Sequence, residues 1–168
     1  MPVVVRDAVL DDVEAITQIQ NALLATTAIE WTDEPHTVEE CHAWLLQQQD
    51  ARLPVLVADD DGDVVGFTTY GEFRDSVRWP GYRLTVEHSI HVREDHWGSG
   101  VGRALIEALA TRARADGKHV MVAAVDGEND ASIRFHERLG FEVVARMPEI
   151  GTKFDRWLDL VLLQRILD

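Results

Sequence analysis

Hydrophobic and polar positions alternate with two different periods along this 168-residue chain. Apolar residues recur at helical spacing over four stretches, which predicts helices at about 10–24, at 38–49, directly behind Gly100 and at about 131–139. Period-two alternation and short β-branched runs predict seven strands. They lie near 2–6, at 53–59, 64–71, 85–92 and 119–125, and near 141–147 and 154–163. The order βααβββαβαββ indicates an α/β fold with a mixed, mostly antiparallel central sheet and helices on both faces.

Three local signals support the boundaries of these elements. Thr37 precedes two glutamates at the start of the second helix, as expected for an N-cap. The segment 60–63 reads Asp-Asp-Gly-Asp between two apolar runs, which predicts a β-hairpin. Gly140 follows the fourth helix, where glycine commonly ends a helix.

Composition restricts the class of protein. A hydrophobic content of 46% and a mean hydropathy of -0.13 predict one soluble globular domain over residues 1–168. The chain has no 18-residue apolar run and no signal-peptide pattern at its beginning, so we expect a cytoplasmic protein without a membrane partner. The net charge of -14 disfavours nucleic acid as a partner. Cys41 is the single cysteine and is interpreted as a packed or incidental thiol.

A glycine-rich segment follows the predicted strand 85–92. Residues 92–109 read VREDHWGSGVGRALIEAL, with glycines at 98, 100 and 102 leading into an amphipathic helix. Glycine allows a sharp turn and a close approach of the backbone to a ligand. The first N–H groups of a helix lack partners within it, and the helix dipole favours anions there. This segment is therefore a candidate backbone site for phosphate.

Four interpretations of the glycine loop compete. A dinucleotide-binding loop needs a third glycine where this chain has Arg103, and it would open a βαβ domain rather than lie mid-chain. A P-loop needs a Gly-Lys-Ser/Thr ending, which is absent from the sequence. The loop could also be a simple connection between strand and helix. The remaining interpretation, a loop for the pyrophosphate of an acyl-CoA, is favoured by the rest of the chain.

The strand 85–92 carries polar side chains at alternate positions. Alternation places one apolar set on one face and one polar set on the other. The first set is Val86, His88, Ile90 and Val92, and the second is Thr85, Glu87, Ser89 and His91. The polar face comes just before the glycine loop and is a candidate ligand-facing surface.

Several segments together resemble a known superfamily. The element order, the loop at 98–102 and NDASIRFHERLGF at 129–141 look like the GNAT superfamily of acyl-CoA-dependent N-acyltransferases. Within it, TVEHSIHV at 85–92, KHVMVAA at 118–124 and GTKFDRWLDL at 151–160 are similar to the phosphinothricin and methionine sulfoximine N-acetyltransferases. The likeness covers almost the whole chain. It implies the GNAT fold, acetyl-CoA as co-substrate and no metal.

The resemblance implies two catalytic residues. Glu87 matches the family's general base, and partial burial would raise the pKa of this carboxyl and make it a better base. His136 lies seven positions after Asn129, where many GNAT enzymes have the tyrosine that protonates the leaving thiolate and phosphinothricin-type enzymes have histidine. The structural alternatives are a solvated glutamate on an exposed strand face and a histidine on a helix surface. His88 and His119 are interpreted as packing residues.

The resemblance also assigns the acetyl-CoA site. A backbone N–H near His91 or Val92 is expected to bind the oxyanion and the pantetheine arm. Asn129 is expected to cap its helix, contact CoA, or do both. Trp97 departs from the Gln or Arg usual in this loop, so one polar side-chain contact is expected to be missing. The cofactor-binding set is Ile90, His91, Val92, Gly98, Ser99, Gly100, Val101, Gly102, Arg103 and Asn129.

The acceptor is expected at the loop 71–83. Arg74 and Arg83 match arginines that flank this loop in the sulfoximine-type enzymes, and a guanidinium can bind an α-carboxylate bidentately. Tyr82 belongs to the same loop, and Trp31 is a candidate aromatic wall. Surface charge and core packing are the alternatives. The loop is about three residues longer than in those enzymes, and Glu30 looks inserted before Trp31, so the acceptor's identity is less well defined than the reaction.

The sequence thus predicts an acetyl-CoA-dependent N-acetyltransferase for the α-amine of a small amino-acid analogue, such as methionine sulfoximine, methionine sulfone or phosphinothricin. An enzyme for a polyamine, an aminoglycoside or a protein N-terminus is the alternative, and a non-catalytic CoA-binding module is a third. The resemblance implies a homodimer. The apolar segment LDLVLLQRIL at 158–167 is either its contact or part of the core.

Overall fold

The computed structural model describes residues 3–168, whose contacts fall into two compact units. Unit 1 contains residues 3–26, Glu34–Tyr70 and Ser89–Arg112, and unit 2 contains Thr27–Asp33, Gly71–His88 and Ala113–Asp168. Strand β4 (Thr85–Val92) and helix α3 (Val101–Ala115) each contribute to both units. The single domain over residues 1–168 stays a prediction.

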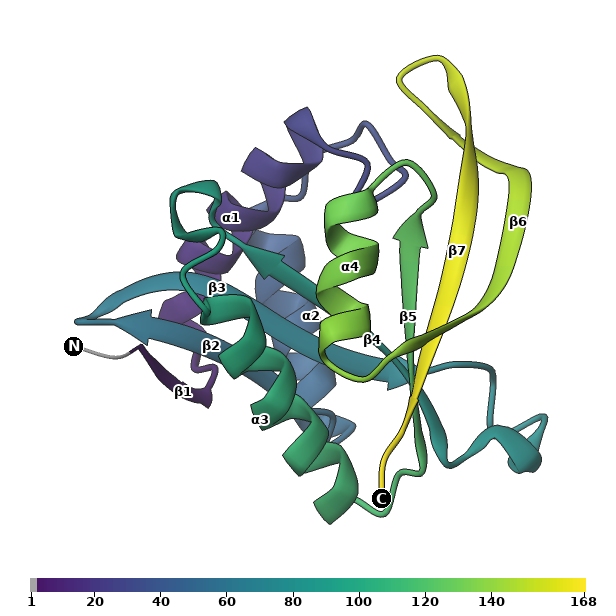
Figure 1. Ribbon diagram of the computed structural model, residues 1–168. Coiled ribbons are helices and arrows are strands. Elements are labelled where there is room, and N and C mark those ends of the chain that lie inside the picture. The colour runs from purple at the N-terminus through teal and green to yellow at the C-terminus, as the bar shows by residue number, and fades with distance from the viewer. Residues whose placement is uncertain (1–2) are drawn as a thin grey trace. The chain divides into compact units, whose positions relative to one another are not determined.

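Unit 1 contains an antiparallel sheet and two helices from the first half of the chain (Figure 1). Its strands follow the order β1, β2, β3 and the second half of β4. The helices α1 and α2 follow the predicted stretches, except that Leu10–Asp12 forms a short 3-10 turn before α1. The bounds are β1 Val4–Asp7, α1 Val13–Thr26, α2 Val38–Asp50, β2 Val55–Asp60 and β3 Asp63–Glu72. Pro2 of the predicted first strand lies outside the described residues.

Helices cover both faces of the unit 1 sheet. Phe67 on β3 belongs to a buried cluster with residues of α1 and α2, which includes Ile16 and Leu45. The adjacent Gly66 points the opposite way, because successive residues of a strand alternate between faces. A Cβ on Gly66 would lie 3.2 Å from Cδ1 of Leu105, on α3. Adjacent positions of one strand therefore contact helices on opposite sides of the sheet, as the sequence predicts.

The predicted boundary signals of unit 1 are confirmed. The Thr37 hydroxyl accepts a hydrogen bond from the backbone N–H of Glu40, whose carboxylate accepts one from the N–H of Thr37, so the two form a capping box. In the hairpin between β2 and β3, Asp61 and Gly62 have φ of 54° and 92°. Two successive left-handed residues match the type I′ turn that joins twisted strands. Cys41 is buried, as the packed-thiol interpretation expects.

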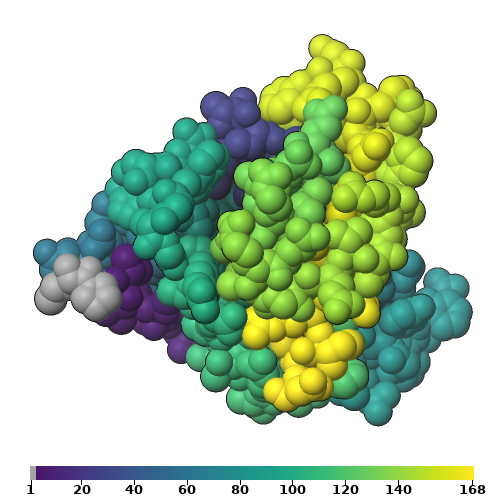
Figure 2. All heavy atoms as spheres, viewed as in Figure 1, coloured from purple at the N-terminus to yellow at the C-terminus, as the bar shows by residue number. Residues whose placement is uncertain are grey.

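Unit 2 contains a second part of the sheet, covered by one short helix. The strand order is the first half of β4, then β5, β7 and β6. Residues Thr85–His88 pair in parallel with Val120–Ala123, and the other pairs are antiparallel. Helix α4 contacts β5, β6 and β7, and its atoms cover part of this sheet (Figures 1 and 2). The bounds are β5 Val120–Asp126, α4 Asp130–Arg138, β6 Glu142–Lys153 and β7 Arg156–Ile166.

The last two strands differ from their predicted ranges. The segment 148–153 contains proline and glycine, so the sequence favours a loop there, yet β6 runs through it to Lys153. A register shift between Met147 and Gly151 accommodates these residues. The turn then falls on Phe154 and Asp155, with φ of 52° and 56°. The predicted strand start at Phe154 is wrong because this turn uses no glycine or asparagine, the residues that normally mark it.

Strand β7 lies between β5 and β6 within unit 2, and several of its apolar side chains belong to the core. Leu158, Val161 and Leu163 are almost completely buried within the chain. Of the two interpretations of segment 158–167, core packing is therefore the one that its burial supports. Among residues 3–168, no helix has the length and apolar character needed to cross a membrane.

Candidate functional site

The glycine loop of unit 1 exposes its backbone. Gly98 and Gly100 have φ of 75° and 95°, a region that side chains rarely adopt, and α3 begins directly afterwards at Val101. No described atom beyond the adjacent residues lies within 4 Å of the point where a Cβ on either glycine would sit. Gly102 lies in the first turn of α3. A phosphate can therefore approach the loop and the N-terminus of α3 closely, which fits the pyrophosphate of acetyl-CoA.

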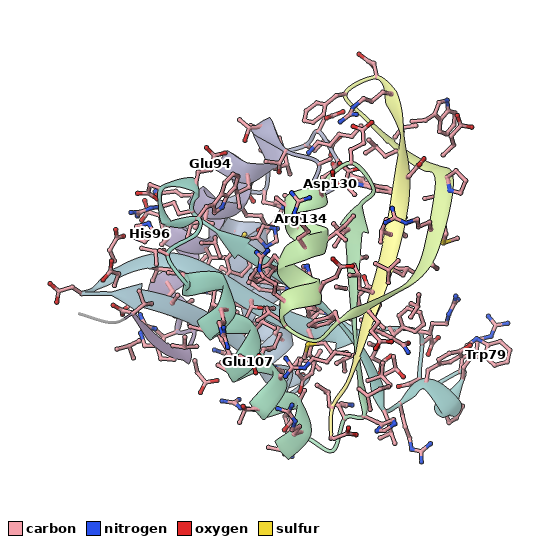
Figure 3. The ribbon with its side chains drawn as sticks, in the orientation of Figure 1. Trp79, Glu94, His96, Glu107, Asp130 and Arg134 are labelled. Carbon is pink, nitrogen blue, oxygen red and sulfur yellow. The ribbon has the colours of Figure 1, made fainter. Side chains whose placement is uncertain are left out.

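Ion pairs attach the segment before this loop to the β2–β3 hairpin. Arg93 donates two hydrogen bonds to the carboxylate of Asp95 and a third, at 2.7 Å, to Asp63. His96 lies between Asp95, at 2.9 Å, and Asp60, at 3.5 Å. Glu94 and His96 project from this segment in Figure 3. These contacts attach the loop to the hairpin, which reduces the ordering that its amides need when they bind an anion.

Trp97 has a structural contact that the sequence does not predict. Its indole Nε1–H donates a hydrogen bond of 2.8 Å to the carbonyl oxygen of Val92, at the end of β4. The hydroxyl of Ser99 also bonds within the loop, to the carbonyl of His96. Trp97 therefore ties the loop to the preceding strand through a side-chain bond.

Glu87 is half-buried on β4 in unit 2. Burial raises the pKa of its carboxyl above the usual value of 4.5, and no neighbouring charge or hydrogen bond adds to this shift. A carboxylate in such a position attracts a proton more strongly than one on the surface. The electrostatic property expected of a general base is thus present at Glu87.

The polar face of β4 is not uniformly exposed. Ser89 is exposed, but His91 is buried and stacks on Phe67 with a ring-centroid distance of 4.7 Å. Both rings belong to unit 1. The expectation that the His91 side chain lines an open polar face is wrong, because the ring completes an aromatic pair in the core. Any contact of His91 with acetyl-CoA would involve its backbone.

His136 on α4 is buried rather than exposed on the helix surface, so the surface-histidine alternative is wrong. Its Nδ1 lies 2.8 Å from the carbonyl oxygen of Ser132, and its Nε2 lies 3.2 Å from Nε2 of His88 on β4. Phe141 contacts both imidazole rings. Desolvation lowers the pKa of His136, so the neutral form is favoured.

These contacts define the hydrogen positions of neutral His136. A carbonyl oxygen can only accept a hydrogen bond, so Nδ1 of His136 carries the proton. In the neutral ring Nε2 is then an acceptor, and Nε2 of His88 is the donor that it faces. Glu87 is adjacent to His88 and points to the other face of β4. The structure therefore brings His136 next to His88, and it separates His136 from Glu87 by the strand.

Asn129 is the N-cap of α4, as expected. Its side-chain oxygen accepts a hydrogen bond of 3.0 Å from the backbone N–H of Ser132. The exposed side chains of Asp130 and Arg134 follow along the same helix (Figure 3). Among residues 3–168, no group of three or more His, Cys, Asp or Glu side chains is arranged to hold a metal ion.

The loop between β3 and β4 carries the candidate carboxylate anchors on its surface. The Arg74 guanidinium lies over the rings of Phe73 and Tyr82, at 5.4 and 5.8 Å from their centroids. Arg83 donates a hydrogen bond of 3.1 Å to the carbonyl of Pro80. Trp79 projects outward from the same loop (Figure 3). Arg74, Tyr82 and Arg83 are all exposed, so they are accessible to a ligand.

Trp31, the fourth acceptor residue, lies against β6 within unit 2. Its indole covers the backbone of Gly151, where a Cβ would come within 2.2 Å of two ring atoms. Nζ of Lys153 donates hydrogen bonds of 2.8 Å to the carbonyls of Thr27 and Glu30 in the same segment. The sequence alone does not identify Gly151 and Lys153 as site residues. Their only signal was their place in GTKFDRWLDL, one of the segments that carry the resemblance.

Comparison with known proteins decides the family. The family model described as "Acetyltransferase (GNAT) family" matches residues 18–141. The chain belongs to this family. It is an acetyltransferase with the GNAT fold, as the sequence predicts.

Individual relatives show to which GNAT acetyltransferases the chain is similar. The chain is 44% identical over 165 residues to an L-methionine sulfoximine/L-methionine sulfone acetyltransferase of Pseudomonas paraeruginosa, covering 98% of this chain and 94% of the relative. An acetyltransferase structure from Salmonella typhimurium, with its cofactor acetyl-CoA, has a TM-score of 0.93 at 43% identity and covers 100% and 95% of the two chains. A phosphinothricin acetyltransferase from Sinorhizobium meliloti in complex with acetyl-CoA has a TM-score of 0.93 at 33% identity, covering 99% and 89%.

Proposed function

We propose that this GNAT enzyme transfers the acetyl group of acetyl-CoA to the α-amine of a small amino-acid analogue of the methionine sulfoximine, methionine sulfone or phosphinothricin class. The observation that carries the proposal is Glu87, a half-buried carboxyl whose pKa is raised by burial alone. The names of the relatives support the acceptor class. Acetylation removes the charge of the α-ammonium, so the product is a changed amino acid, and we propose detoxification as the role.

Glu87 is the proposed general base. Even the α-ammonium of a peptide has a pKa of about 8, and that of a free amino acid is higher, so most of the acceptor is protonated at neutral pH and cannot attack. The Glu87 carboxylate takes this proton, directly or through water, and the neutral amine then attacks the thioester carbonyl that acetyl-CoA supplies. A backbone N–H near His91 or Val92 is proposed to stabilise the oxygen that becomes negative.

His136 is the proposed source of the proton for the departing sulfur. Because it lies on the opposite side of β4 from Glu87, and the amine and the sulfur share one carbon in the tetrahedral intermediate, its proton would reach the sulfur through a relay. Because neutral His136 accepts at Nε2, it must first gain a proton there; His88 can pass on its Nε2 proton only as its own Nδ1 takes one up, so the net proton comes from solvent. The close contact of the two rings supports this path within unit 2.

The donor site is proposed on unit 1. The N–H groups of the glycine loop and the first turn of α3 would hold the pyrophosphate, and Ile90–Val92 would bind the pantetheine arm. The open space beside Gly98 and Gly100 supports this assignment. Arg103 is exposed in the first turn of α3 and can add a side-chain contact. Asn129 keeps its proposed CoA contact beside its role as a helix cap.

The acceptor site is proposed on unit 2. Arg74 and Arg83 would bind the α-carboxylate, because a guanidinium matches its two oxygens. Tyr82 already supports Arg74 through its ring face, which limits the freedom of the guanidinium. Trp31 would form an aromatic wall at the other end of the unit 2 sheet: it covers Gly151, which pairs with Leu158, whereas Thr85, just after Arg83, pairs with Val120. The arginines and Trp31 would therefore not border the same point of one chain.

A homodimer and a cytoplasmic location complete the proposal, with no nucleic-acid or membrane partner. Because Leu158, Val161 and Leu163 of β7 are buried within the chain, the dimer contact is better sought on β6. There Val144, Met147 and Ile150 are exposed apolar side chains. Light scattering of Met147→Asp against the unaltered protein tests this contact, since a charge in an apolar interface disfavours association.

The proposed reaction is tested by measuring thiol release from acetyl-CoA with a panel of amines. We expect turnover with methionine sulfoximine, methionine sulfone or phosphinothricin well above the rate without acceptor. Turnover only with a polyamine, an aminoglycoside or a peptide N-terminus would replace the acceptor class. Stabilisation by both CoA and acetyl-CoA without turnover on any amine would indicate a CoA-binding module instead.

A further inference from the structure

Gly151 and Lys153, at the end of β6, contact the segment Thr27–Asp33, which belongs to the same unit. Lys153 is a buried cation, with only 3% of its surface exposed. Its Nζ donates to the carbonyls of Thr27 and Glu30, both at 2.8 Å, and the side chain lies over the Phe154 ring at 4.8 Å. Burying an ammonium is unfavourable unless its donors are satisfied. The two hydrogen bonds of the buried Lys153 ammonium therefore hold the backbone of this segment in a defined geometry.

Gly151 fixes the side chain that this segment carries. A Cβ at Gly151 would lie 2.1 and 2.2 Å from Cε3 and Cζ3 of Trp31. These distances are far below van der Waals contact, so the indole occupies the volume that any other residue would need. The ring can pack flat on β6 only because residue 151 has no side chain.

The backbone of β6 and of the turn after it is irregular around Gly151. The register with β7 shifts between Met147 and Gly151, and Glu149 has a φ of 52°. Phe154 and Asp155 also adopt left-handed φ values, which non-glycine residues seldom do. Backbone of this kind persists where surrounding contacts hold it, and it is common next to functional sites. Here the distorted strand presents Gly151 and Lys153 to one segment.

We infer that Gly151 and Lys153 are positioning residues for the acceptor: they fix Trp31 as a rigid wall and thereby determine which amines bind. The inference rests on the proposed function, in which Trp31 borders the acceptor. Neither residue is assigned a contact with acetyl-CoA. Changes at both should therefore affect the KM of the acceptor, and they should leave the KM of acetyl-CoA unaltered.

The first test is a double-mutant cycle between residues 151 and 31. Gly151→Ala is expected to raise the acceptor KM about tenfold or more with little change in kcat, because the methyl group displaces the indole. Trp31→Ala is expected to raise it similarly. In the Trp31→Ala background, Gly151→Ala should have no further effect, because the atoms that it would contact are gone. The same KM increase from Gly151→Ala in both backgrounds, or a wild-type KM for Gly151→Ala, overturns the inference.

Measuring whether each variant folds keeps the test interpretable even when Gly151→Ala is unstable. If Gly151→Ala alone does not fold, the inference requires that the double variant Gly151→Ala/Trp31→Ala folds, because the three described atoms nearest to the new methyl group all belong to Trp31. A double variant that also fails to fold overturns the inference.

The second test removes the cation. Lys153→Met keeps the length of the aliphatic chain and loses the two hydrogen bonds to Thr27 and Glu30. We expect a raised acceptor KM and an unchanged KM for acetyl-CoA. Thr152→Ala is the matched control, because Thr152 lies between the two residues and is exposed. An equal rise in both substrates' KM for Lys153→Met would indicate general loss of structure and would overturn the positioning role.

The unaltered enzyme separates this inference from the proposed function. If it acetylates no amine of the panel, the proposed function fails and the inference fails with it. If it turns over a panel amine while both variants keep wild-type acceptor KM values, only the positioning role fails.

Discussion

The two units of this acetyltransferase use different chemistry for their proposed ligands. In unit 1, the candidate donor site consists mainly of backbone: two glycines with positive φ, the N-terminus of α3 and a network around Arg93 that holds the loop. In unit 2, the candidate groups are side chains, namely Glu87, His136, the loop arginines and Trp31. Backbone binding of a phosphate depends on chain conformation, whereas proton transfer depends on the environment of single ionisable groups.

This difference predicts separable failures. A substitution that strains the loop should weaken binding of acetyl-CoA and should leave the chemical step intact once the donor is saturating. A substitution at an ionisable group of unit 2 should do the reverse.

Glu87→Gln should have the largest effect. The amide cannot accept the proton of the ammonium, so kcat at neutral pH should fall by about 10²-fold or more. The dissociation constant of acetyl-CoA, measured by calorimetry, should not change. Glu142→Gln, at an exposed position of β6, is the control. Near-normal turnover of Glu87→Gln would remove Glu87 from the mechanism.

Gly100→Ala should weaken acetyl-CoA binding by about tenfold, because holding alanine at a left-handed φ costs about 1–2 kcal/mol. Gly117→Ala is a matched control away from this loop: its φ of 71° is also left-handed, and a Cβ at either position has open space. Both variants should lose similar stability in urea. Equal acetyl-CoA affinity in the two would show that Gly100 has no special role in donor binding.

His136→Asn should lower kcat by up to about tenfold, less than the usual effect of a general acid, because a thiol with a pKa near 8.5 leaves readily. The amide keeps a hydrogen-bond donor near the Ser132 carbonyl but cannot titrate. His42→Asn, exposed on α2, is the control for loss of a histidine. A kcat for His136→Asn equal to that of the control would assign the proton transfer to solvent.

The pH dependence of kcat/KM should report Glu87. The carboxyl must be deprotonated to act as base, and burial raises its pKa above 4.5. Activity should therefore fall as the pH decreases through that raised pKa, which places the acid limb above pH 4.5. This limb should be missing from the residual activity of Glu87→Gln. An identical limb in the variant would show that another group causes it.

The smallest expected effect concerns stability. A folded-state pKa above the unfolded one means that the folded protein binds this proton more tightly. The contribution of Glu87 to stability is then present at low pH and is lost as the pH rises through the folded pKa. Glu87→Gln should accordingly unfold at a slightly higher urea concentration than the unaltered protein at pH 7, with no such gain at pH 4. A lower midpoint at pH 7 would contradict the burial argument.

The sequence predicts most of the fold because local signals agree with one another. The capping box at Thr37, the Asp-Gly turn at 61–62 and the alternation over 85–92 each specify an element without distant contacts. The end of β6 shows where this fails. Proline and glycine at 148 and 151 indicate a loop, but pairing with β7 carries the strand through them to a turn with no glycine.

The candidate site divides in the same way. The glycine loop can be read from the sequence because its conformation depends on residues next to one another. The burial of His91 and the pairing of His136 with His88 depend on residues that are far apart in the chain. The contact of Trp31 with Gly151 is of the same kind. Periodicity indicates the face on which a side chain lies, and it does not indicate the partner that the side chain meets there.

The proposed division is that backbone groups bind the donor and side chains transfer the protons. Measuring acetyl-CoA affinity and kcat together for Gly100→Ala and Glu87→Gln is its most direct test. We predict opposite patterns: Gly100→Ala binds acetyl-CoA more weakly and keeps a nearly normal kcat, whereas Glu87→Gln has a lower kcat and binds acetyl-CoA normally. Loss of the same quantity in both variants would contradict the account.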